Sequence, residues 1–79
     1  MAASPDPSIL FLRRFGKRLK QLRIERDLTQ EQLARAGRLN RTFIGKLERG
    51  QSGVNVDRLE DLARALGLTV RDLMPKDDT

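Results

Sequence analysis

The chain has 79 residues, enough for one small domain, with a formal net charge of +5 and 34% charged residues. It contains no cysteine and no histidine, which excludes disulfide bridges, thiolate or imidazole metal sites and histidine-based catalysis. It also lacks a secretory signal pattern and an apolar run of about 18 residues. We therefore expect a cytoplasmic protein without a membrane anchor.

The positive charge gathers in the first two-thirds of the chain. Residues 9–50 hold 12 Lys and Arg against four Asp and Glu, whereas residues 51–79 hold four against six. Such a distribution is typical of a surface that binds a polyanion, and the simple alternative is an ordinary solvated helix surface.

Residues 1–8 contain two prolines and predict a flexible lead, with Ser8 as the cap of the helix that follows. A helix is expected from residue 9 to about residue 26, because apolar residues recur there at spacings of three and four. The residues expected on its inner face are Ile9, Phe11, Leu12, Phe15, Leu19 and Leu22.

Two short helices follow in quick succession. Thr29 and Gln32 have the spacing of a capping box at the start of a helix over residues 30–36, which Gly37 is expected to stop. Asn40 can cap a third helix that runs to about residue 49. A joint this brief is typical of a helix-turn-helix corner, with Leu39 filling the inside of the turn.

The rest of the chain predicts two more helices. Asn55 can cap a helix over residues 56–66, which ends at Gly67. Thr69 and Asp72 open a short fifth helix, and residues 76–79 form a polar tail. Because no alternating strand pattern occurs, we expect an all-α bundle of five helices in one domain over residues 9–75.

The outer face of the third predicted helix carries polar residues that suit DNA. Arg41, Thr42, Gly45 and Lys46 form one stripe, opposite the apolar residues of that helix. Arg and Lys can donate to guanine, and Thr can use its hydroxyl or its methyl group in the major groove. Gln30 stands at the start of the second helix, where backbone amides attract phosphate.

Residues 29–34, which read TQEQLA, and residues 39–50, which read LNRTFIGKLERG, resemble the Cro/repressor-type helix-turn-helix proteins of the Xre family. The RTFI stretch is similar to the controller proteins of restriction–modification systems. The resemblance covers about residues 13–74 and implies a lambda-repressor-like bundle whose second and third helices form the helix-turn-helix. The implied function is that of a DNA-binding regulator. The residues themselves predict no enzyme, because the carboxylates show no paired arrangement, no nucleophile has a base beside it and no glycine-rich phosphate loop occurs, and no cofactor or metal is expected.

The resemblance also implies roles for single residues. Arg23 and Glu48 match a structural ion pair that ties the first helix to the third. The residues expected to contact DNA are Thr29, Gln30, Arg38, Arg41, Thr42, Lys46, Arg49 and Asn55.

One departure from the family pattern falls at the turn, where Gly37 precedes Arg38. Either Arg38 adopts the left-handed conformation, at a cost of about 1 kcal/mol or more, or the turn differs. Arg38 is then expected to point toward phosphate.

The apolar residues near the C-terminus exceed what a two-turn helix buries alone. They either close the core of the monomer or form a dimer seam. The seam is favoured because an operator with two half-sites related by a two-fold axis requires a dimeric protein. The residues in question are Leu68, Val70, Leu73 and Met74.

The sequence therefore predicts a transcriptional regulator that binds a palindromic operator as a homodimer, with its third helix in the major groove. RNA polymerase is a further candidate partner. The alternative functions are an antitoxin or adaptor module that works through protein contacts, and a non-specific nucleic-acid binder.

Overall fold

The computed structural model describes residues 6–76, which fold into five helices and contain no strand. This confirms the predicted all-α class. The helices are α1 (Pro7–Glu25), α2 (Gln30–Gly37), α3 (Arg41–Glu48), α4 (Val56–Leu66) and α5 (Val70–Leu73). None of these helices is long and apolar enough to cross a membrane.

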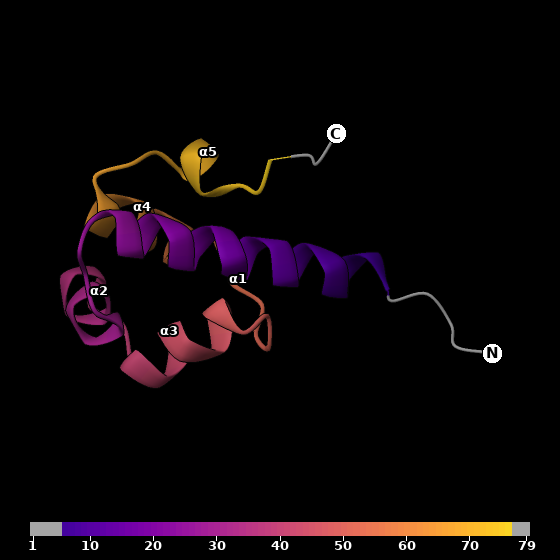
Figure 1. Ribbon diagram of the computed structural model, residues 1–79, viewed down its shortest axis with the longest axis horizontal. Helices are drawn as coiled ribbons and strands as arrows, with labels where there is room; N and C mark the ends of the chain where they lie inside the picture. Colours follow the sequence, from indigo (N-terminus) through magenta and orange to yellow (C-terminus); the bar gives the residue numbers. More distant parts are fainter. Residues whose placement is uncertain (1–5, 77–79) are drawn as a thin grey trace.

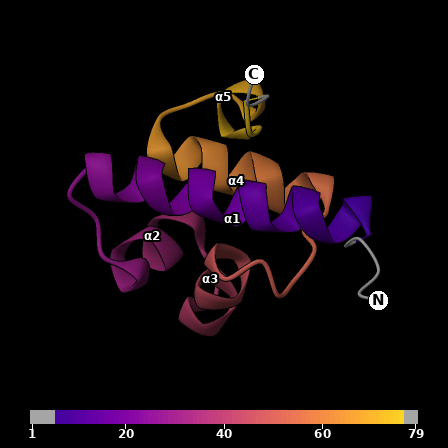
Figure 2. The ribbon, with the colours of Figure 1, turned by 45° about the vertical axis from the view of Figure 1, so that its right-hand side comes forward.

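The longest helix, α1, runs through the middle of the molecule, as Figures 1 and 2 show. Helices α2 and α3 lie on one side of it and α5 lies on the other. Helix α1 packs against α3 and α5, while α2 packs against both α3 and α4. The two halves of the helix-turn-helix are therefore held by different neighbours.

One apolar cluster lies between the helices and supplies the main driving force for folding. Three of its members, Phe15, Leu19 and Leu22, come from α1 and follow the predicted spacing of four and three. The other helices contribute the remaining members, which are Leu33, Ala34, Ile44, Leu47, Leu62, Ala63, Leu66 and Leu73.

The first two turns of α1 extend past this core. Ile9, Leu10 and Phe11 are 43%, 38% and 44% exposed. The prediction that Ile9 and Phe11 face the interior is therefore wrong. Periodicity reports which residues share a helix face, but it does not report where the neighbouring helices stop.

Helix α1 also begins earlier than the sequence predicts. Asp6, and not Ser8, is the N-cap, since its Oδ1 accepts hydrogen bonds from the Ser8 amide at 2.8 Å and from the Ser8 hydroxyl at 2.6 Å. Pro7 suits the first helical position because it has no N–H to satisfy. The helix thus includes the end of the predicted lead, while residues 1–5 of that lead and 77–79 of the tail lie outside the described residues.

Helices α1 to α4 all end in the same way, with a left-handed residue just after the last turn: Asp27, Arg38, Gly50 and Gly67. After α2, the Leu39 amide donates to the Ala34 carbonyl at 2.7 Å. After α4, the Leu68 amide donates to the Ala63 carbonyl at 2.8 Å. These bonds define Schellman motifs, which satisfy carbonyls that the helix leaves free.

The turn at Arg38 decides between the two alternatives left by the sequence. Arg38 has φ 57° and ψ 43°, so an arginine does occupy the left-handed position. Gly37 is not the stop but the last residue of α2, where a Cβ would lie 3.3 Å from Leu39 Cδ1 and 3.6 Å from Ala65 Cβ. This glycine serves close packing rather than an unusual backbone angle.

Candidate nucleic-acid interface

Helix α3 presents a polar face opposite a buried one. Ile44 and Leu47 are 0% and 1% exposed, whereas Arg41, Thr42 and Lys46 are exposed to solvent. The helix starts firmly, because Asn40 Oδ1 accepts a hydrogen bond of 2.7 Å from the Thr42 amide. The three exposed side chains therefore project from a helix that is fixed on the core and capped at its N-terminus.

Gly45 does not belong to this exposed stripe, contrary to the sequence-based expectation. It is buried because Arg49 covers it, and a Cβ on Gly45 would lie 3.0 Å from Arg49 Nη1. Arg49 Nε also donates to Gln51 Oε1 at 2.9 Å. The Arg49 guanidinium thus folds back along α3, and its predicted role in binding DNA remains a prediction.

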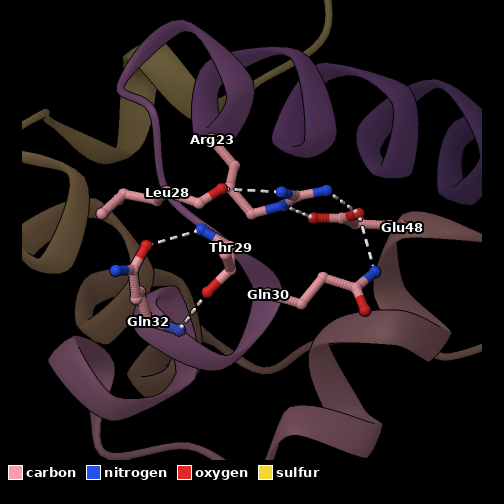
Figure 3. A network of polar contacts seen from close by, with 6 residues as sticks. All are labelled: Arg23, Leu28, Thr29, Gln30, Gln32 and Glu48. Atoms are coloured by element: carbon pink, nitrogen blue, oxygen red, sulfur yellow. Dashed lines mark hydrogen bonds and ion pairs between the residues drawn. The ribbon is translucent and has the colours of Figure 1, made fainter.

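An ion pair between Arg23 and Glu48 connects α1 to the end of α3 (Figure 3). Arg23 Nε lies 2.6 Å from Glu48 Oε2, and Nη2 lies 3.0 Å from Oε1. The two side chains are 11% and 3% exposed. The hydrogen bond to Glu48 raises the pKa of the Arg23 guanidinium above its ordinary value. This is the pair that the resemblance implied.

The same guanidinium also fixes the segment between α1 and α2. Arg23 Nη1 donates to the Leu28 carbonyl at 2.7 Å, just before Thr29 opens α2. One side chain therefore holds α3 and the entry to α2 together, as Figure 3 shows. Its charge is neutralised by Glu48, so its burial is compensated.

Gln30 completes the network from the other side. Its Nε2 donates to Glu48 Oε1 at 3.0 Å, which joins the start of α2 to the end of α3 (Figure 3). A carboxylate only accepts hydrogen bonds, so the amide must turn its nitrogen toward Glu48. The oxygen and the second N–H of Gln30 remain for other partners. The sequence did not reveal this contact, because it depends on side chains from two helices.

Three of the other predicted DNA contacts serve as local caps or turn residues. Thr29 Oγ1 accepts from the Gln32 amide at 3.0 Å, and Gln32 Oε1 accepts from the Thr29 amide at 2.8 Å. The capping box is therefore present. Asn55 Oδ1 caps α4 by accepting from the Arg58 amide at 2.9 Å. Thr29, Arg38 and Asn55 are all exposed.

The predicted dimer residues divide into two groups. Leu73 is 0% exposed and belongs to the core of the monomer, so its assignment to a dimer seam is wrong. Its burial follows from the packing of α5 against both α4 and α1. Leu68, Val70 and Met74 are only half-buried against the same core, which leaves part of each side chain at the surface.

Comparison with known proteins identifies the class to which this arrangement belongs. A family model described as helix-turn-helix matches residues 19–73, and the chain belongs to that family. The matched range begins within α1 and includes all of α2 to α5. The chain is thus a DNA-binding regulator rather than an enzyme.

Two relatives and one solved structure show which helix-turn-helix proteins this chain is similar to. The control protein C.BamHI of Bacillus amyloliquefaciens is 38% identical over 61 residues, 76% of this chain and 75% of the relative. The control protein C.MunI of a Mycoplasma species is 41% identical over 61 residues, 76% of this chain and 82% of that relative. The crystal structure of the restriction–modification controller protein C.AhdI of Aeromonas hydrophila superimposes with a TM-score of 0.79 at 41% identity, covering 80% of this chain and 96% of that one.

Proposed function

We propose that this protein is a sequence-specific transcriptional regulator that places α3 in the major groove of DNA. One observation carries the proposal: Arg41, Thr42 and Lys46 are exposed on the face of α3 opposite Ile44 and Leu47, which anchor the helix in the core. A helix presented in this way fits the major groove, with its N-terminal residues nearest the bases. Similarity to control proteins, and to the restriction–modification controller protein C.AhdI, supports a controller role in a restriction–modification system.

The regulator acts as a homodimer on a palindromic operator. The exposed parts of Leu68, Val70 and Met74 supply an apolar surface beside α5, on the opposite side of α1 from α3. A two-fold pair would set two copies of α3 on half-sites about 34–36 Å apart. Such a regulator works in the cytoplasm, where RNA polymerase is its candidate protein partner.

Selection of bound duplexes from a random pool tests the proposal directly. The expected result is an enriched palindrome whose two halves are centred about one helical turn apart. Enrichment of a single half-site would contradict the dimer. Equal recovery of all sequences would contradict specific reading and favour a non-specific or adaptor function instead.

Arg41→Ala tests the reading residue itself. We expect the variant to lose about 1–3 kcal/mol of binding free energy on the selected site and to relax the preference at one base pair. Lys20→Ala removes the same charge from an exposed position on α1 and serves as the control. A uniform loss on every sequence would make Arg41 a phosphate contact rather than a reader of bases.

A further inference from the structure

A groove runs along α1 on the side that faces the segment after α5, away from α3. It consists of two adjoining hollows of about 410 Å³ and 310 Å³. Arg14, Pro75 and Lys76 line both hollows, so the two form one continuous surface. Figures 1 and 2 show that α5 and the segment after it lie across α1 from α3. DNA held by α3 would leave this groove free.

One end of the groove is strongly basic. Arg14, Lys17, Arg18 and Lys76 line it together with Gln21, and the described lining residues include no acid. Positions 14, 17, 18 and 21 share one face of α1 because they are three and four residues apart. Arg18 is held in place, since its Nε donates to the Asp72 carbonyl at 3.2 Å. Four cations around one hollow create a positive potential that attracts anionic groups.

The other end of the groove is apolar. Pro7, Leu10 and Phe11 line it, and Leu10 and Phe11 are 38% and 44% exposed. Phe11 is fixed by stacking on the buried Phe15, with ring centroids 6.4 Å apart. These residues lie on the part of α1 that precedes the matched family range of 19–73. Neither Leu10 nor Phe11 belongs to the buried core, so the apolar end remains available to a partner.

We propose that this groove binds an extended segment of a partner protein that has apolar residues at one end and acidic residues at the other. The order of chemistry along α1 supports this occupant, because an apolar end adjoins a basic end. Residues 7–21 rise about 21 Å along the helix, which an extended segment of roughly six residues would span. Duplex DNA would match the cations but offers nothing for Leu10 and Phe11. A second copy of the groove would offer the cations no acidic partner.

A labelled hexapeptide with the order Leu-Phe-Gly-Asp-Glu-Asp is a suitable probe, with fluorescence anisotropy for affinity and amide chemical shifts for location. We expect shifts in residues 7–21 and 74–76 but not in α3. Lys17→Glu should weaken binding about fivefold or more. Lys20→Glu carries the same charge change on α1 outside the groove and should leave the affinity within a factor of about two. Leu10→Ser should weaken binding, and Ile24→Ser, at a position 54% exposed on the same helix, should not.

Several results would overturn the proposal. Equal losses in Lys17→Glu and Lys20→Glu would mean general attraction only. Undiminished binding of a probe with Asn and Gln in place of its acids would mean that the basic end of the groove does not recognise the acids. A change of sedimentation in Lys17→Glu alone would assign the groove to a second copy. Displacement of the probe by duplex DNA that lacks the operator would assign it to DNA. Operator binding is measured separately on each variant, so a failure of the proposed function remains distinguishable.

Discussion

In the described residues, the helix-turn-helix corners α2–α3 and α4–α5 share one backbone design. Helix α2 ends in a left-handed residue, Arg38, and α4 ends in Gly67. In each corner the next residue is a leucine whose amide returns to a carbonyl of the preceding helix. A side-chain cap then opens the following helix, with Asn40 before α3 and Thr69 before α5. The junction between α1 and α2 follows the same design with Asp27, Leu28 and Thr29, so the design occurs three times in the described residues.

The two corners differ in what the second helix shows to solvent. Helix α3 is two turns long and exposes Arg41, Thr42 and Lys46. Helix α5 has four residues, of which Arg71 and Asp72 are exposed and Val70 is half-exposed. Only the first corner is tied by a buried ion pair among the residues that the structure describes. The backbone motif alone therefore does not define a DNA-reading element. The outer side chains and the fixed pose of the second helix define it.

The largest expected effect on stability comes from removing the Arg23–Glu48 ion pair, which distinguishes the α2–α3 corner from the α4–α5 corner. Glu48→Ala leaves the Arg23 guanidinium buried without its partner and also frees Gln30, so we expect a loss of about 3 kcal/mol or more in unfolding free energy. Urea denaturation measures it. Glu31→Ala removes an exposed glutamate that pairs with Arg35 at 3.2 Å, and should cost under about 1 kcal/mol. Equal losses of unfolding free energy in the two variants would show that the buried ion pair contributes no more than an exposed one, and the corners would then not differ in this respect.

The next effect tests how closely α3 approaches α1. A Cβ on Gly16 would lie 2.3 Å from the Leu47 carbonyl oxygen and 2.7 Å from that of Glu48, and backbone atoms cannot move aside cheaply. We expect Gly16→Ala to cost about 2–3 kcal/mol. In Gly53→Ala the new Cβ meets nothing within 4 Å, so that variant should be close to neutral. A stable Gly16→Ala would show that the α1–α3 crossing is not fixed.

The sequence predicts local features well, because their chemistry is contained within a few neighbouring residues. The capping boxes of Thr29 with Gln32 and of Thr69 with Asp72 both occur where their spacing places them. The Arg23–Glu48 pair spans 25 positions, and only the family resemblance made it visible.

Features that depend on where one helix ends against another could not be predicted. Gly16 lies in a helical pattern with nothing nearby in the sequence to signal the crossing of α3. Phe11 and Leu73 both have apolar side chains at helical spacing, yet the first is exposed and the second is fully buried. The difference arises from neighbours that are far away in the chain.

Exchanging the residues at the two left-handed positions tests the shared design of the corners. Arg38→Gly should raise the unfolding free energy by up to about 1 kcal/mol, because glycine adopts a positive φ without strain. Gly67→Arg should lower it by about 1 kcal/mol for the same reason. Thermal or urea unfolding measures both. If Arg38→Gly is destabilising, the Arg38 side chain makes a contact that outweighs its backbone strain, and the corners are not equivalent.

The smallest effect concerns the caps, which differ in whether they titrate. The Thr69 amide and hydroxyl donate to the Asp72 carboxylate and lower its pKa, and the charges of Arg18 and Arg26 add to this. A lowered pKa contributes stability above the unfolded value of about pH 4, and this stability is lost as the pH falls through the folded value. Asp72→Asn should therefore flatten the acid limb of the stability curve relative to the unaltered chain. Gln32, the corresponding residue in the first corner, carries no charge, so Gln32→Ala should lower urea midpoints by the same amount from pH 2 to pH 7. If Asp72→Asn also lowers the urea midpoint by the same amount at every pH, Asp72 caps α5 without using its charge.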